Sequence, residues 1–235
     1  GALYIPGDFH VSSSRLTRAF SYAAELLGAE LIERCEVTSF HIEEDRICEV
    51  ESDRGTFHAE HVVLAAGAWT AALAKQLGAH LPIVPMKGES LAIFPRKARF
   101  ERTLLAEGCY LVPKADGKVI VGATERRGDF TEWVTTDALR RLTSKAIRLV
   151  PELADSNFIR AWASVRPSSP DGLPYVGRLG HYRNLFVATA HFRNGILLSP
   201  ITGQRIAELI AGEDVPDLKP FSPNRLQSDG NEVQQ

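Results

Sequence analysis

The sequence is poor in the residues that mark several common classes of protein. It has only three cysteines in 235 residues, Cys35, Cys48 and Cys109, and they form neither a C-x-x-C pair nor a disulfide framework. This usage favours a reducing compartment, so we expect a cytoplasmic protein. The seven histidines show no metal-ligand spacing, so no metal site is predicted.

Long apolar runs and a charge excess are also missing. The longest apolar runs, such as Val62 to Trp69, are far too short to span a bilayer, and no signal peptide is visible at Gly1. The formal net charge is -2, which gives no positive field to attract nucleic acid or an anionic membrane. What is present, 44% apolar and 24% charged residues, is typical of a globular protein with a substantial core.

Two outer parts of the sequence read as α/β structure. A helix follows Ser12 and ends at Gly28, and a second helix spans 69–77. Residues 61–66 are almost continuously apolar, which predicts a strand buried on both faces, as in a parallel sheet. A second buried strand is expected at 185–189, followed by a helix that Ser199 and Pro200 open. Further short strands are expected at 29–33, 36–42, 46–51 and 56–59.

The middle of the sequence reads differently. Antiparallel strands are expected at 89–94, 109–113 and 118–124, and the last two flank a hairpin signal at 115–117. A helix capped by Thr136 and Asp137 follows, and then an alternating strand at 158–166. We therefore predict an α/β domain of residues 1–81 and 179–226 that an α+β domain of residues 82–178 interrupts. Residues 1–11 fit either domain, and 227–235 are expected to be disordered.

Four stretches carry a resemblance to a known family. They are HVVLAAGAW (61–69), PMKGESL (85–91), YLVPKADGKVIVGATERRGDF (110–130), and the region from VRPSSPDGLPYVG to HFRNGILLSPITG (165–203). In order and spacing they resemble the FAD-dependent D-amino-acid oxidase superfamily, and within it the bacterial glycine oxidases of thiamine biosynthesis. The resemblance extends to about Leu226.

The resemblance implies an incomplete FAD-binding, Rossmann-like domain interrupted by an antiparallel-sheet substrate domain. Family members begin with a strand, a G-x-G-x-x-G turn and a helix that bind the FAD pyrophosphate. This sequence contains no G-x-G-x-x-G. The expectation is therefore that a missing N-terminal segment or a second chain supplies this unit, and the sequence leaves both options open.

The same resemblance assigns cofactor contacts, with FAD bound non-covalently because no cysteine follows Cys109. Reduction of the flavin places negative charge where the positive end of the last helix would lie. Without the resemblance, these segments would be a plain strand end and a surface helix start, with Arg193 a solvated charge. The implied FAD contacts are Val37, Ala65, Ala66, Gly67, Trp69, His191, Phe192, Arg193, Asn194, Gly195, Ile196 and Leu197.

Three residues are implied to bind the substrate. Arg166 ends the alternating strand, and its guanidinium can place two N–H groups on an amino-acid carboxylate. Tyr110 matches a tyrosine whose hydroxyl supports the same carboxylate, and Arg193 is the third candidate. The alternatives are an ion pair of Arg166 with Asp171 and an edge-strand aromatic role for Tyr110. No catalytic protein base is expected.

The expected function is FAD-dependent oxidative deamination of glycine or another small amino acid by dioxygen. The products would be an imine or oxo acid, ammonia or an amine, and hydrogen peroxide, in service of thiamine biosynthesis. Two alternatives stay open: a D-amino-acid dehydrogenase that reduces a quinone, and an inactive fragment that needs a partner chain for FAD. A homo-oligomer is also expected. By the same resemblance, Ala190 stands where glycine oxidases usually carry glycine.

Overall fold

The computed structural model describes residues 3–7, 9–98 and 100–226, and the predicted tail at 227–235 lies outside them. The described chain forms two compact units. The first contains the residues up to 33 together with 88–125 and 132–164, and the second contains 34–87, 126–131 and the residues from 165 onward. Residues 165–178, expected in the interrupting domain, are thus part of the second unit. No helix in the described ranges is both long and apolar enough to cross a membrane.

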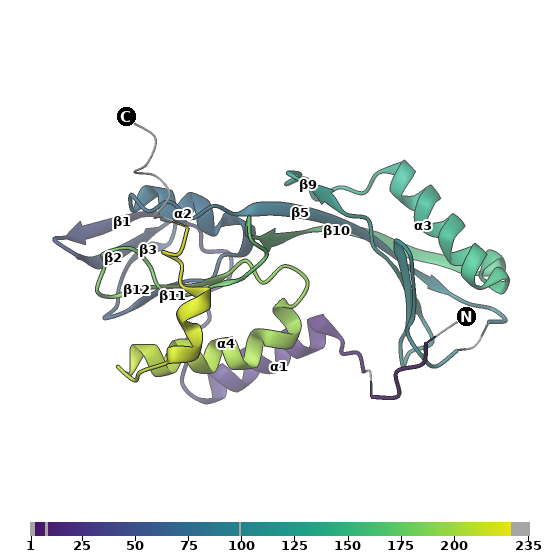
Figure 1. The fold of residues 1–235 in the computed structure, drawn as a ribbon, viewed down its shortest axis with the longest axis horizontal. Coiled ribbons are helices and arrows are strands. Elements are labelled where there is room, and N and C mark those ends of the chain that lie inside the picture. The colour runs from purple at the N-terminus through teal and green to yellow at the C-terminus, as the bar shows by residue number, and fades with distance from the viewer. Residues whose placement is uncertain (1–2, 8, 99, 227–235) are drawn as a thin grey trace. The chain divides into compact units, whose positions relative to one another are not determined.

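An antiparallel sheet dominates the first unit (Figure 1). The strand order is β10-β5-β8-β7-β6, and the two-residue strand β9 (Arg126–Arg127, in the second unit) pairs with β5. The expected strands at 89–94, 109–113 and 118–124 are confirmed, whereas the short strand at 104–106 was not predicted. The strands are β5 (Val84–Phe94), β6 (Leu104–Ala106), β7 (Cys109–Pro113), β8 (Val119–Gly122) and β10 (Asn157–Ser168).

Helix α3 (Thr136–Leu149) covers one face of this sheet, as Figure 1 shows. Its apolar stripe, which includes Leu142 and Ala146, packs against Leu91, Leu111 and Val121 from three neighbouring strands. The side chain of Thr135 caps the helix by accepting a hydrogen bond from the Ala138 N–H at 3.2 Å. The predicted cap at Thr136 and Asp137 is therefore displaced by one residue. The short 3-10 helix η2 (Pro151–Asp155) follows.

The first unit also contains α1 (Ser13–Leu26), which ends at Gly28 as predicted. Gly28 has a φ of 95°, a left-handed conformation that suits glycine after a helix. The strand predicted at 29–33 is wrong, because these residues pair with no strand in the described chain. A short apolar run becomes a strand only where a neighbour accepts its backbone hydrogen bonds.

A three-stranded sheet in the order β11-β12-β4 organises the second unit. Strand β12 (Leu185–Thr189) pairs in parallel with β4 (Val62–Leu64) and antiparallel with β11 (Tyr175–Arg178). Helix α4 (Gly195–Ile210) packs on one face and α2 (Thr70–Gln76) on the other (Figure 1). The mixed helix and sheet composition and the strand at 185–189 are confirmed. The 3-10 helices η1 (Gly67–Trp69) and η3 (Pro216–Phe221) complete the unit.

Strand β4 departs from its prediction in burial. The parallel partner is confirmed, but β4 has three residues, lies at the edge of its sheet, and leaves Val63 39% exposed. The prediction of burial on both faces was wrong because the described chain covers only the α2 face of this strand fully. On the other face Val63 lines a groove beside α4.

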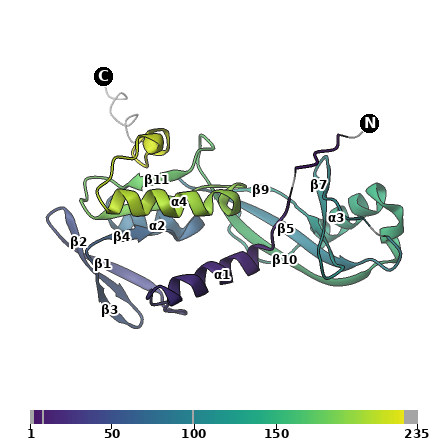
Figure 2. The same ribbon diagram turned by 90° about the horizontal axis from the view of Figure 1, so that it is seen from below.

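An antiparallel meander of β1 (Val37–Glu43), β2 (Arg46–Ser52) and β3 (Gly55–His58) adjoins this sheet (Figure 2). The fully buried Asn184 joins the two sheets. Its Oδ1 accepts a hydrogen bond from the Ile47 N–H at 3.0 Å, and its Nδ2 donates to the carbonyls of Ile47 at 2.8 Å and Glu60 at 3.1 Å. The Asn184 carbonyl accepts from the Val62 N–H at 2.8 Å, so one residue fixes the start of β4.

We predict that Asn184→Ala lowers the free energy of unfolding by about 2–4 kcal/mol, because it leaves the buried N–H and carbonyl of Ile47 without their side-chain partner. Urea unfolding followed by circular dichroism measures the loss. Asn157→Ala, at an exposed position, is the matched control and should change stability by less than about 0.5 kcal/mol. Equal effects of the two substitutions would show that the Asn184 hydrogen bonds are not what holds the meander.

Candidate functional site

The carboxyl ends of β4 and β12 lie side by side in the second unit, because these strands pair in parallel with Leu64 opposite Val187. Ala65, Ala66 and Gly67 follow β4, and Gly67 has a left-handed φ of 57°. At the end of β12, the hydroxyl of Thr189 donates to the Gly67 carbonyl at 2.9 Å. Thr189, 2% exposed, was not predicted to matter. The one sequence feature that could have pointed to Thr189 is a hydroxyl side chain at the last position of a predicted buried strand.

The turn after β12 holds two non-glycine residues in the left-handed region. Ala190 has a φ of 62° and Phe192 a φ of 50°, each at a cost of about 1–2 kcal/mol. The φ of Ala190 explains why a glycine is the easier residue at this position. The Phe192 N–H donates to the carbonyl of Pro167 at 2.8 Å. The strained turn therefore lies against the end of β10, one residue from Arg166.

Helix α4 begins at Gly195 and not at Ser199 and Pro200, so that prediction was wrong. Pro200 has no N–H to donate to the Ile196 carbonyl four residues earlier. The Ser199 hydroxyl donates to that carbonyl instead, at 3.0 Å, and the helix tolerates the proline. By helix geometry the first N–H groups, including those of Gly195 and Leu197, have no partner within the helix. They form the positive end of the helix dipole.

A groove of about 360 Å³ connects these segments. The lining comes from β4 and the residues after it, from β12 and the turn after it, and from α4. Most of the lining side chains are small, and His191 and Ile206 are the larger ones. The lining residues are Val63, Ala65, Ala188, His191, Gly195, Ser199, Thr202, Gly203 and Ile206. Three predicted cofactor residues, Ala65, His191 and Gly195, thus share one groove although 130 positions separate the first from the last. A shallow apolar floor with N–H groups at one end suits a flat ligand with a polar edge.

His191 faces α4 inside this groove. Its Nε2 lies 3.0 Å from the hydroxyl of Thr202. Burial lowers the pKa of His191 below its ordinary value, because a desolvated imidazolium is costly. The imidazole is therefore neutral at pH 7 and forms a hydrogen bond that orients it toward the helix.

Arg166 lies half-buried near the end of β10. Within the described residues, no side chain or backbone group forms a hydrogen bond or ion pair with its guanidinium. The alternative of an ion pair with Asp171 does not hold, because Asp171 pairs with Arg225 through contacts of 2.8 and 2.9 Å. The Arg166 guanidinium is therefore available to an anion from outside this part of the chain.

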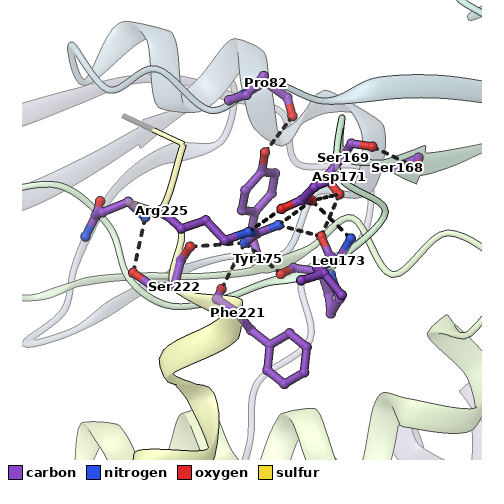
Figure 3. Close-up of polar contacts among 11 residues, drawn as sticks. Pro82, Ser168, Ser169, Asp171, Leu173, Tyr175, Phe221, Ser222 and Arg225 are labelled. Carbon is purple, nitrogen blue, oxygen red and sulfur yellow. Dashed lines mark hydrogen bonds and ion pairs between the residues drawn. The ribbon is translucent and has the colours of Figure 1, made fainter. Parts of the chain in front are cut away.

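Arg225 explains how the loop after β10 is fixed (Figure 3). Besides Asp171, it donates to the carbonyl of Leu173 in this loop at 2.7 Å and to that of Ser222, which follows η3, at 3.0 Å, and so ties the loop to the segment after η3. Its guanidinium also lies 4.2 Å from the ring centre of Tyr175. Hydrogen bonds from Arg225 hold the pKa of Asp171 well below its usual range, and burial raises the pKa of Tyr175 to about 12.

The remaining predicted residues occupy varied positions. Val37 begins β1 and does not line the groove. Trp69 is 50% exposed, and its ring centre lies 6.3 Å from that of Phe130. Arg193 and Asn194 are exposed in the turn, and the side chains of Ile196 and Leu197 are 44% and 78% exposed. Tyr110 belongs to the first unit, on β7.

Comparison with known proteins places this arrangement in a family. Residues 1–209 match the model of the DAO family, described as FAD dependent oxidoreductase. The chain belongs to this family. A glycine oxidase of Geobacillus kaustophilus is 42% identical over 228 residues, which cover 96% of this chain and 60% of that protein. The bifunctional protein ThiO/ThiG of Trichormus variabilis is 37% identical over 232 residues, which cover 97% of this chain and 35% of that protein.

The solved structures agree. The crystal structure of glycine oxidase from Geobacillus kaustophilus superimposes with a TM-score of 0.90 at 40% identity, over 94% of this chain and 60% of that one. The expected membership of the DAO family of FAD-dependent oxidoreductases is therefore confirmed. The chain spans about 60% of the length of the first glycine oxidase that it matches.

We predict that His191 makes stability pH-dependent. Its folded-state pKa lies below the unfolded value of about 6.5, so the unfolded state binds the proton more readily. The contribution of His191 is then fully present above about pH 6.5 and is lost as the pH falls through the folded-state pKa. Urea midpoints of the wild type and of His191→Gln, compared from pH 8 to pH 5, measure it.

The difference between these two midpoints should shrink as the pH falls. Asn157→Ala, a substitution of a non-titrating residue at an exposed position, serves as the control and should run parallel to the wild type. A constant difference between wild type and His191→Gln across the range would contradict the buried neutral imidazole.

Proposed function

We propose that this protein is an FAD-dependent oxidase of glycine or another small primary or secondary amino acid. The observation that carries the proposal is the groove at the carboxyl ends of β4 and β12. The turn beside this groove is hydrogen-bonded to the end of β10, which carries the unpaired guanidinium of Arg166. Membership of a family of FAD-dependent oxidoreductases supports it. In this proposal the β11-β12-β4 sheet belongs to the FAD-binding domain, and the antiparallel sheet of the first unit belongs to the substrate domain.

The groove residues fit a flavin. Ala65, Gly67 and Gly195 present little side chain, so a planar ring system can approach their backbones. The N–H groups at the start of α4 would donate to the polar edge of the ring, where the helix dipole favours negative charge. When bound, FAD would supply the acceptor for the hydride that leaves the substrate α-carbon. The exposed Trp69 and Ile196 are further proposed contacts.

Arg166 is the proposed anchor of the substrate carboxylate. The guanidinium is half-buried, so a carboxylate would bind it in an environment of reduced dielectric. Its planar fork can form two charge-assisted hydrogen bonds at once. For Tyr110 and Arg193 the substrate-binding role rests on the family motifs, and both side chains lack a hydrogen-bond partner in the described part of the chain.

The protein residues would orient the substrate and exclude water. A neutral substrate amine is required for loss of a hydride, and a carboxylate fixed by Arg166 holds the α-carbon in one place. The Nε2 of His191 is hydrogen-bonded to the Thr202 hydroxyl, and His191 is not assigned as a catalytic base. The imine product would hydrolyse in water to an oxo acid and ammonia or an amine, and dioxygen would be reduced to hydrogen peroxide. The relative named ThiO/ThiG supports a role in thiamine biosynthesis.

The electron acceptor can be measured directly. Peroxide released per mole of glycine consumed should approach one if dioxygen is the acceptor. A dehydrogenase would give little peroxide and would reduce an added quinone instead. A protein loaded with FAD that oxidises neither glycine nor any other small amino acid with either acceptor would end the proposal.

We predict that Arg166→Ala in the FAD-loaded enzyme raises the KM for glycine about 10- to 150-fold, since the lost charge-assisted contacts contribute about 1.5–3 kcal/mol. Arg166→Lys should recover only part of the loss, because an ammonium cannot form the paired contact. Arg148→Ala, which removes an exposed arginine from α3, is the matched control. An unchanged KM in Arg166→Ala would remove the anchor role.

We also predict that these 235 residues alone bind FAD weakly, because a G-x-G-x-x-G turn is absent from them. Joining the dinucleotide-binding segment of the Geobacillus kaustophilus enzyme to the chain should tighten binding by at least about 100-fold, or about 2.7 kcal/mol. Quenching of flavin fluorescence measures both affinities. A fusion with its second motif glycine replaced by valine is the control and should lose the gain. Equal affinity of the isolated chain and the intact fusion would contradict the prediction.

A further inference from the structure

At position 122, in the first unit, a neighbouring side chain leaves room only for glycine. Strands β7 and β8 pair antiparallel with Tyr110 directly opposite Gly122. A Cβ built on Gly122 would lie 2.3 Å from both the Cζ and the hydroxyl oxygen of Tyr110 and 2.6 Å from its Cε2. The phenol ring therefore lies across the strand pair, with its hydroxyl end directly above the Gly122 backbone.

A left-handed φ does not account for this glycine. Eleven other glycines in the described chain have a φ in the left-handed region, and Gly122 is not one of them. Its φ lies outside the range that disfavours a side chain, and the contact that a Cβ would meet is the Tyr110 ring. At Gly108 a Cβ would also come within 3 Å of a neighbour, but there the neighbour is the flexible end of Lys145.

Packing on the opposite face of the strand pair prevents the two strands from moving apart to make room for a side chain at Gly122. Leu111 and Val121, the residues next to Tyr110 and Gly122, are fully buried in the core beneath α3. Because this packing fixes the two backbones, a methyl group at Gly122 would be accommodated by displacement of the Tyr110 ring. The displacement would be about 1 Å, the difference between 2.3 Å and an ordinary contact of 3.4 Å.

The hydroxyl that would move has no hydrogen-bond partner within the described residues, and Tyr110 is only half-buried. We infer that Gly122 is a positioning residue, which sets the place of the Tyr110 hydroxyl and thereby the fit of the substrate carboxylate. This inference rests on the proposed function, because it takes Tyr110 as a substrate-binding residue. It adds a residue that touches neither substrate nor cofactor and acts through the ring above it.

Steady-state kinetics of Gly122→Ala in the FAD-loaded enzyme tests the inference. A misplacement of about 1 Å can cost about 100-fold in catalytic efficiency, and we expect kcat/KM for glycine to fall between 10- and 100-fold, chiefly through KM because the Tyr110 hydroxyl is proposed to bind the substrate carboxylate. Gly7→Ala adds the same methyl where nothing lies within 4 Å, and it should behave as the wild type. In a Tyr110→Phe background, Gly122→Ala should cause less than a threefold further loss, because the hydroxyl is already gone.

A spectroscopic measurement separates ring displacement from activity. The chain is labelled with 3-fluorotyrosine, and the ¹⁹F resonance that disappears in Tyr110→Phe is assigned to Tyr110. Gly122→Ala should shift this resonance, whereas Gly7→Ala should leave it in place. If Gly122→Ala does not fold, Tyr110→Ala in the same chain should restore folding by removing the ring, and failure to restore it would overturn the inference.

The outcomes distinguish the two proposals. An enzyme that does not oxidise small amino acids, or in which Tyr110→Phe has normal kinetics, removes the proposed role of Tyr110 and with it this inference. An active enzyme in which Tyr110→Phe is impaired but Gly122→Ala has normal kcat/KM and an unshifted resonance leaves the function intact. In that case only the role of Gly122 is rejected.

Discussion

The parallel pairing of β4 with β12 is the constraint on which the candidate site depends. Parallel neighbours end at the same edge of a sheet, so the glycine after β4 and the turn after β12 are brought together although the two strands are far apart in sequence. The hydrogen bond from Thr189 to Gly67 then joins the two ends. If that register slipped by one residue, the Thr189 side chain would change faces and the turn would lose its position.

In both units, small residues leave the space in which larger groups can lie. In the second unit, Ala65 and Gly195 keep side chains out of the groove. In the first unit, Gly122 leaves room for the ring of Tyr110. Such small side chains suit a protein whose cofactor carries the chemistry, because the protein then has to bind the cofactor, orient the substrate and polarise the reacting groups. The strained Ala190 and Phe192 are consistent with a turn whose shape matters more than its stability.

A well-fixed loop follows Arg166, whose guanidinium has no partner in the described residues. Asp171, the nearest acidic residue along the chain to Arg166, is held by Arg225 in a network that also includes the ring of Tyr175. Because this partner is already taken, the Arg166 guanidinium has no ion pair in the described chain. An arginine that is half-buried and unpaired carries a desolvation cost that an incoming carboxylate would relieve.

The sequence by itself determined the family, the antiparallel strands of the first unit, most helices, and the segments that line the groove, because periodicity and turn residues act over a few positions. It did not determine that residues 29–33 find no strand partner, that α4 starts at Gly195 although Pro200 lies inside it, or that Val63 is exposed. Those outcomes depend on which groups the folded chain places within hydrogen-bonding or packing distance. The contacts of Asn184, Thr189 and Gly122 have the same origin, since each joins residues that only the tertiary structure makes neighbours.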